Sequence, residues 1–173
     1  MNYKEKLNKV ETFVFDVDGV FTDGKIIVDS QGKESRLFNT KDGIAVKLAN
    51  DLGYSIAIIT GANNKGIKER MNRLGIKNVF LNSSDKVKDL LNFSKTNNIN
   101  LEKTVYMGDD LPDTFPMKLV YLKTCPNDAA PEVREISDYI SNKKGGEGCV
   151  RDIIEQTLKV QGNWDLNKKN QNI

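Results

Sequence analysis

The chain has 173 residues, of which 26 are lysine or arginine and 24 are aspartate or glutamate, for a formal net charge of +2. This length is enough for one domain with its own core, and the balance of charge gives no indication of nucleic acid or an anionic membrane as a partner. The sequence has no histidine, which excludes Ser–His and Cys–His catalysis and every imidazole-ligated metal site. Acid–base chemistry must therefore use carboxylates, lysine, tyrosine, cysteine or water.

Membrane insertion and secretion are not expected. No apolar run approaches the roughly 20 residues that a membrane-spanning helix needs, and the polar first residues lack the apolar core of a signal peptide. The two cysteines, Cys125 and Cys149, make neither a disulfide framework nor a metal cluster. We therefore expect a soluble protein of the cytoplasm.

Strands and helices are expected to alternate along most of the chain. The strands are predicted at residues 13–15, 54–59, 77–81, 104–107, 119–122 and 139–140, and the helices at 44–52, 63–74, 86–96, near 116, at 131–136 and at 149–160. Asp42 is expected to cap the first of these helices. The alternation predicts a three-layer, Rossmann-like α/β core with a mainly parallel sheet. We expect one domain over residues 1–162 and a polar, frayed tail over residues 163–173.

A β-hairpin is predicted between the first strand and the first helix. Residues 25–29 and 34–38 read as two short strands around a glycine-containing loop. Because a lone hairpin is only marginally stable in water, we expect it to pack on its own domain or on another subunit.

Two aspartates one residue apart, Asp16 and Asp18, follow the first predicted strand, and Gly19 comes next. Ligands bind at the carboxyl ends of the strands in open α/β sheets, so both carboxylates should stand at the mouth of a site. Two such carboxylates repel each other unless a cation lies between them, and oxygen ligands favour a hard ion such as magnesium. The alternative is a solvated turn, because Asp and Gly are ordinary turn residues.

Three further features are expected at the same edge of the sheet. Thr60 ends a strand and precedes Gly61, where a hydroxyl and backbone N–H groups suit a phosphate oxygen. Lys86 opens the next helix, and a fourth strand ends in an acidic loop that can complete a hard-metal site, formed by Asp109, Asp110 and Asp113. Together these groups would make a cradle for a dianionic phosphoryl group. Taken singly, Thr60 could be a turn residue, Lys86 a solvated lysine and the acidic loop a helix cap.

These motifs resemble those of the haloacid dehalogenase-type (HAD) phosphatases, in particular the 3-deoxy-D-manno-octulosonate 8-phosphate phosphatases and their relatives acting on nine-carbon sialic-acid-type 9-phosphates. The resemblance runs from about residue 12 to residue 162 and includes the segments 18–24, 39–43 and 145–151. It implies an Mg²⁺-dependent phosphoric monoester hydrolase that acts on a phosphorylated sugar acid, with no cap domain. It also implies a homotetramer in which the hairpins pack centrally and a neighbour covers each site.

The resemblance also implies residue roles. Asp16 would be the nucleophile that forms an aspartyl-phosphate, and Asp18 would be the general acid and base. Magnesium would be held by Asp16, Asp109 and the backbone carbonyl of Asp18, with Asp113 and Asp110 orienting it. Thr60, Gly61 and Lys86 would hold the phosphoryl group. The sugar acid would meet Asp18 and a further set of residues: Asn39, Thr40, Lys41, Asp42, Gly43, Lys47 and Arg70. Lys47 and Arg70 could equally be solvated helix charges.

One position departs from the octulosonate enzymes, which typically have Thr-Gly-Arg where this chain has Ala62 after Gly61. A cation expected near the substrate carboxylate is therefore missing, and Arg73, one helical turn beyond Arg70, could compensate. The departure leaves an eight-carbon and a nine-carbon substrate both open. Two other functions also stay open, a phospho-receiver module and a catalytically weak or inactive oligomeric protein of the same fold.

Overall fold

The computed structural model describes residues 2–164, so most of the predicted tail, residues 165–173, lies outside the described residues. The strands of this described part are β1 (Thr12–Phe15), β2 (Ile27–Val28), β3 (Glu34–Ser35), β4 (Ser55–Ile59), β5 (Asn78–Phe80), β6 (Thr104–Met107), β7 (Leu122–Cys125) and β8 (Tyr139–Ile140). The helices are α1 (Tyr3–Leu7), α2 (Thr40–Asp51), α3 (Lys65–Arg73), α4 (Lys86–Thr96), α5 (Thr114–Met117), α6 (Pro131–Ile136) and α7 (Cys149–Val160), with 3₁₀ turns η1 (Leu101–Lys103) and η2 (Leu111–Asp113).

Six strands form a parallel sheet in the order β5-β4-β1-β6-β7-β8. The central strand β1 aligns Phe15 with Ile58 of β4 on one side and with Met107 of β6 on the other. Every residue of β1 and β6 is buried, which explains why these segments are rich in apolar residues rather than alternating.

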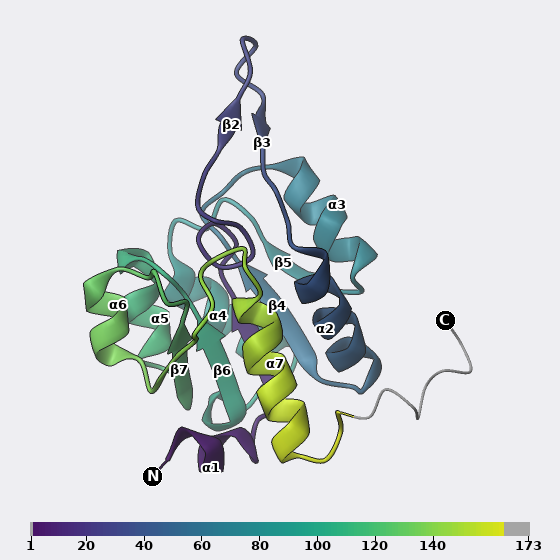
Figure 1. Cartoon of the computed structure of the whole chain (residues 1–173), viewed down its shortest axis with the longest axis vertical. Helices are drawn as coiled ribbons and strands as arrows, with labels where there is room; N and C mark the ends of the chain where they lie inside the picture. The colour runs from purple at the N-terminus through teal and green to yellow at the C-terminus, as the bar shows by residue number, and fades with distance from the viewer. Residues whose placement is uncertain (1, 165–173) are drawn as a thin grey trace.

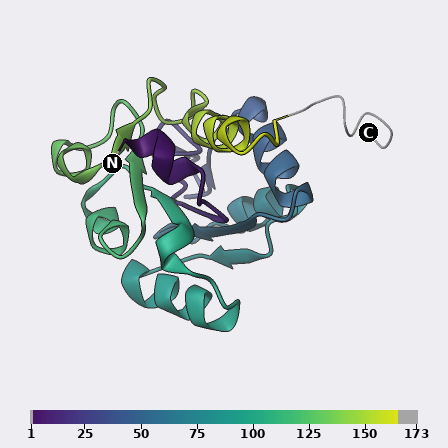
Figure 2. The same ribbon diagram turned by 90° about the horizontal axis from the view of Figure 1, so that it is seen from below.

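Helices cover both faces of this sheet (Figures 1 and 2). Phe13 and Phe15 of β1 face a core built with α1, α2, α3 and α7, whereas Val14 faces a second core built with α4, α5 and α6. Successive side chains of β1 thus point to opposite faces of the sheet and belong to two separate hydrophobic cores. The predicted three-layer α/β fold with a mainly parallel sheet is confirmed.

The hairpin of β2 and β3 stands out from the carboxyl edge of the sheet (Figure 1). We call residues 25–38 the flap. Its strands are two residues each, shorter than predicted, and the apolar side chains of Ile27, Val28 and Leu37 are 59%, 60% and 77% exposed. Between β1 and α2 the described chain holds this flap and connecting loops, without the helices or larger sheet of a cap domain.

Several boundaries differ from the sequence prediction. Helix α1 was not predicted, and α2 begins four residues early because Asn39, not Asp42, is its N-cap and accepts a hydrogen bond from Lys41 N. The strand predicted at 119–122 is wrong at its start, since residues 119 and 120 form a turn that bonds back to Pro116 and Met117, and β7 begins at Leu122.

Residues 161–164, which follow α7, are held by hydrogen bonds, although this segment was expected to fray. Gln161 Nε2 donates to the carbonyls of Leu7 and Val10 at 2.7 and 2.9 Å. The backbone N–H of Trp164 donates to Leu158 O at 3.1 Å. The boundary between domain and tail at residue 162 stays a prediction.

Candidate active site

The side chains predicted at three strand ends lie together at the carboxyl edge of the sheet. Asp16 directly follows β1, Thr60 follows β4, and Asp109 follows β6 after one glycine. They line one cavity of about 350 Å³, which we call the edge cavity. Five other residues predicted for the site also line it: Asp18, Gly61, Lys86, Asp110 and Asp113.

Lys86 lines the edge cavity and lies buried between two aspartates. Its ammonium is 2.9 Å from Asp16 Oδ2 and 2.7 Å from Asp113 Oδ1. Burial alone would lower the pKa of Lys86, but the two carboxylates outweigh it and raise that pKa above its ordinary value. The lysine therefore brings a fixed positive charge to the site.

Asp113 is fully buried, and both of its oxygens already accept hydrogen bonds. Oδ1 accepts from Lys86 and from the Tyr106 hydroxyl at 2.9 Å. Oδ2 accepts from the backbone N–H groups of Asp109 and Asp110 at 3.1 and 3.4 Å. These bonds hold the acidic loop and Lys86 in place, so Asp113 supports the site rather than reaching towards a ligand.

Asp16 and Asp109 supply the oxygens that fit a metal ion. One oxygen each from Asp16, Asp109 and Asp113 lie within 4.8 Å of one another. Asp16 Oδ1 and Asp109 Oδ1 are buried and have no hydrogen-bond partner within residues 2–164. Buried carboxylate oxygens without a donor are costly unless a cation lies beside them, and an all-oxygen donor set suits magnesium. We call Asp16, Lys86, Asp109 and Asp113 the ionic cluster.

The pKa values of Asp16 and Asp109 also indicate that a cation is needed beside these carboxylates. Burial, and then the carboxylates of Asp16 and Asp113, raise the pKa of Asp109 to about 8. Burial and Asp113 likewise raise the pKa of Asp16 to about 6, against the lowering effect of Lys86. The site therefore carries more negative charge than Lys86 offsets, and a divalent cation would stabilise both carboxylates in their ionised form.

Glycines bring three loops into close contact around this cluster. Gly19 has a φ of +84°, and a Cβ built there would lie 1.9 Å from Asp109 Oδ2. The loop before α7 packs on the same turn, because a Cβ at Gly145 would lie 2.0 Å from Gly19 O. Gly146 N donates to Val20 O at 3.0 Å, which fixes this loop against the loop that carries Asp18.

Thr60 is buried beside the cluster with its hydroxyl proton available. Thr60 Oγ1 accepts a hydrogen bond from Ala62 N at 3.3 Å, so the hydroxyl can still donate to an anion in the edge cavity. Because Lys86 lines the same cavity, the cavity offers both a charged and a neutral donor to a phosphoryl group.

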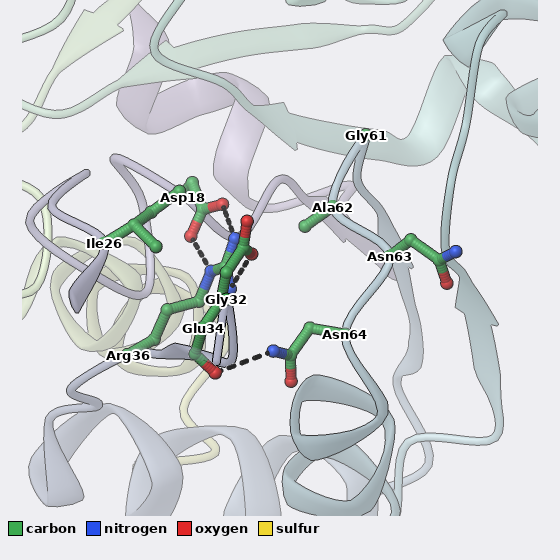
Figure 3. A pocket seen from close by; sticks show the side chains of 9 residues that line it. All are labelled: Asp18, Ile26, Gly32, Glu34, Arg36, Gly61, Ala62, Asn63 and Asn64. Atoms are coloured by element: carbon green, nitrogen blue, oxygen red, sulfur yellow. Dashed lines mark hydrogen bonds and ion pairs between the residues drawn. The ribbon is translucent and has the colours of Figure 1, made fainter. Parts of the chain in front are cut away.

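Arg36 of the flap is a site residue that the sequence analysis missed (Figure 3). Its Nε and Nη2 donate to the two oxygens of Asp18 at 2.7 and 3.0 Å, and its Nη1 donates to Glu34 at 3.0 Å. The only sequence signal was a cation on the hairpin that follows the two aspartates. The hairpin orientation that aims it at Asp18 could not be read from the sequence.

Most of the residues predicted to meet the sugar acid lie outside the edge cavity. Asn39 caps α2, and its Nδ2 donates to Gly146 O at 3.1 Å. The guanidinium of Arg70 lies over Gly43, where an added Cβ would be 2.7 Å from Nη2. Thr40, Lys41 and Lys47 are exposed side chains elsewhere on α2. Asp18 alone among the predicted sugar-acid residues lines the cavity.

Asp42 is placed differently from its expected contact with substrate, because its side chain is fully buried. Its Oδ1 accepts a hydrogen bond of 2.7 Å from Arg151 N in the first turn of α7, whose own N-cap is Gly148. Burial raises the pKa of Asp42 to about 6. Asp42 thus caps α7 from the neighbouring helix and is out of reach of a sugar in the cavity.

Comparisons with known proteins place the chain among sugar-acid phosphatases. No family model matches. The chain is 33% identical over 160 residues to the 3-deoxy-D-manno-octulosonate (KDO) 8-phosphate phosphatase of Salmonella typhi, covering 92% of this chain and 85% of the relative. Among solved structures, the Moraxella catarrhalis KDO 8-phosphate phosphatase in complex with magnesium, phosphate and KDO superposes with a TM-score of 0.90 at 34% identity, covering 94% and 93% of the two chains. The cobalt-bound Haemophilus influenzae phosphatase superposes with a TM-score of 0.89 at 28% identity, covering 94% and 97%. A separate observation concerns membranes. Within residues 2–164, no helix is long and apolar enough to cross a membrane.

Proposed function

The chain belongs to the 3-deoxy-D-manno-octulosonate 8-phosphate phosphatase family of the HAD superfamily, and from that premise we propose that it is a magnesium-dependent phosphatase of a phosphorylated 3-deoxy-2-keto sugar acid. The substrate would be octulosonate 8-phosphate or a nine-carbon nonulosonate 9-phosphate. The observation that carries the proposal is the pair of unpartnered buried oxygens, Asp16 Oδ1 and Asp109 Oδ1, beside Lys86 and Thr60.

Asp16 attacks the phosphorus in the first step. A bond forms between its carboxylate oxygen and phosphorus, and the bond from phosphorus to the sugar oxygen breaks. Asp18, one residue beyond Val17, gives a proton to the departing sugar oxygen. In the second step Asp18 takes a proton from water as the water oxygen attacks phosphorus, and the bond to Asp16 breaks to release phosphate. Arg36 donates to both oxygens of the ionised Asp18, the form that takes the proton from water in the second step, and so orients it for that transfer.

Thr60 and Lys86 bind the oxygens of the phosphoryl group, and Gly61 allows the chain to approach it. Asp16, Asp109 and the backbone carbonyl of Asp18 are the groups that would hold magnesium, which offsets phosphate charge when bound. Asp113 positions Lys86 and the acidic loop through its four hydrogen bonds, and Asp110 continues that loop.

We further propose a homotetramer in the cytoplasm. The exposed apolar side chains on the flap support an assembly, because two-residue strands cannot stabilise a hairpin alone. Lys47 and Arg70, which lie outside the edge cavity, would reach a substrate only across such a contact. The cysteines, Cys125 and Cys149, are buried free thiols, as is usual in a reducing compartment. Light scattering should give the mass of four chains, and a monomer at micromolar concentration would overturn the assembly.

A phosphate-release screen with magnesium tests the function. We expect turnover of octulosonate 8-phosphate or a nonulosonate 9-phosphate, and a loss of at least ~10³-fold in Asp16→Asn, because the amide cannot attack phosphorus. Glu102→Gln, the same change at the opposite end of β6, is the matched control and should keep full activity. Unchanged turnover in Asp16→Asn would remove the nucleophile assignment. No turnover of any phosphate ester would favour the inactive protein or the phospho-receiver.

A further inference from the structure

A second cavity of about 550 Å³ lies between the flap and the loop that follows β4 (Figure 3). We call it the flap cavity. Asp18, Gly61 and Ala62 line both this cavity and the edge cavity, so the two are neighbours. A molecule whose phosphate lies beside Asp16 can therefore extend its other end into the flap cavity.

Arg36 is the group in the flap cavity that can bind an anion. Among the described residues that line the cavity, Arg36 alone carries a positive charge. Its side chain is only 4% exposed, although both residues of each flap strand are exposed. Lys86, in the edge cavity, is tied to Asp16 and Asp113 and lies on the phosphate side. The acid end of a substrate would therefore meet Arg36.

The guanidinium of Arg36 has donors left for a ligand. It carries five N–H groups in a planar fork. Three of them donate to Asp18 and Glu34, which leaves two within the described structure. A further carboxylate can thus bind Arg36 without displacing Asp18. Ala62 on the facing wall is short and leaves space for it.

We propose that Arg36 binds the carboxylate of the substrate and so selects phosphorylated acids over phosphate esters that lack a carboxylate. The proposal rests on the proposed function and adds the residue that sets its substrate class. Charge-assisted, paired hydrogen bonds make arginine well suited to a carboxylate. Because the same guanidinium holds Asp18, the substrate acid and the proton-transferring group are positioned by one side chain.

The test is the ratio of kcat/KM for octulosonate 8-phosphate to kcat/KM for ribose 5-phosphate, which has no carboxylate. We expect this ratio to fall roughly 100-fold in Arg36→Met, which keeps the length and removes the charge. In Arg36→Lys, which keeps the charge and loses the fork, it should fall about tenfold. Lys33→Met is the matched control, since Lys33 is an exposed cation on the same flap and should leave the ratio unchanged.

Two outcomes would overturn the inference. An unchanged ratio would show that Arg36 does not bind the carboxylate, and if both kcat/KM values fell equally Arg36 would act only by positioning Asp18. Equal affinity of the wild type and Arg36→Met for the sugar acid is the second such outcome. Binding of the dephosphorylated sugar acid, measured by calorimetry, tests Arg36 independently of turnover. Affinity should weaken by roughly 100-fold in Arg36→Met, and equal affinity would reject the inference even if the wild-type protein hydrolysed no ester.

Discussion

The ionic cluster and the flap hold their charges in different ways. In the cluster, Lys86 and Asp113 are buried, and both carboxylate oxygens of Asp113 accept hydrogen bonds from Lys86, Tyr106 or the acidic loop. The flap has exposed strands. It is held to the rest of the molecule by Phe38, which packs on the first core, and by the hydrogen bonds of Arg36 to Asp18 and of Asn64 to Glu34 O. We infer that the buried ionic cluster positions the groups for phosphate chemistry and that the flap contacts the rest of the substrate.

Breaking the cluster should have the largest effect. In Asp113→Asn an amide replaces an acceptor that faces donors on both sides, so an NH₂ group must face either Lys86 and Tyr106 or the backbone N–H groups of the acidic loop. Leaving buried donors unpaired should lower the free energy of unfolding by about 3 kcal/mol and remove most activity. Urea unfolding and phosphate release would measure both.

Asp110→Asn is the matched control for that change. Asp110 is exposed, and its side chain accepts a hydrogen bond from Leu111 N as the N-cap of η2, a role that asparagine also fills well. It should alter the free energy of unfolding by less than about 0.5 kcal/mol. An equal decrease in the free energy of unfolding in Asp113→Asn and Asp110→Asn would mean that the buried hydrogen bonds of Asp113 do not stabilise the cluster.

Changes in pH and in magnesium concentration should have a smaller effect on the free energy of unfolding. Without metal the raised pKa values of Asp16 and Asp109, about 6 and about 8, mean that the folded protein binds more protons than the unfolded chain above about pH 4. Its stability should therefore fall as pH rises through these values. Magnesium favours the ionised carboxylates, so its stabilisation should grow from about pH 6 to about pH 8. It should reach about 2.7 kcal/mol at 100 times the dissociation constant.

Thermal unfolding across this pH range, with and without magnesium, would measure that growth. Asp109→Asn should lose most of this growth, because the amide carries no negative charge and does not titrate. Stabilisation by magnesium that is the same at every pH would show that protons and metal do not compete for this pair.

The smallest effect should come from loosening the flap. Asn64 caps α3 by accepting from Gly66 N, and its Nδ2 donates to Glu34 O at 3.1 Å. Asn64→Ser keeps a good N-cap and removes the amide donor, so the free energy of unfolding should change by less than about 0.5 kcal/mol. We expect KM to rise a few-fold with kcat nearly unchanged. A kcat loss as large as that of Asp113→Asn would contradict the division between core and flap.

The convergence of Asp16, Thr60 and Asp109 was predictable from the sequence, because parallel neighbours end at the same edge and each of these residues follows an apolar run. The contact of Arg36 with Asp18 was not, since it depends on how an exposed hairpin leans over the sheet. The burial of Asp42 was also hidden, because it comes from α7, which packs on α2 from more than a hundred residues away. Local pattern thus located the strand ends, while contacts between distant elements needed the structure.

The packing of Gly145 and Gly146 on the turn at Gly19 joins the loop that follows β1 to the loop that precedes α7. During translation the segment with Asp16 and Asp18 leaves the ribosome first, yet the loop that supports it emerges more than a hundred residues later. A nascent chain stopped before residue 145 would carry all four residues of the ionic cluster but would lack the loop that packs on the turn at Gly19. If the proposed function holds, we therefore expect catalytic competence only after residues 145 and 146 have been synthesised.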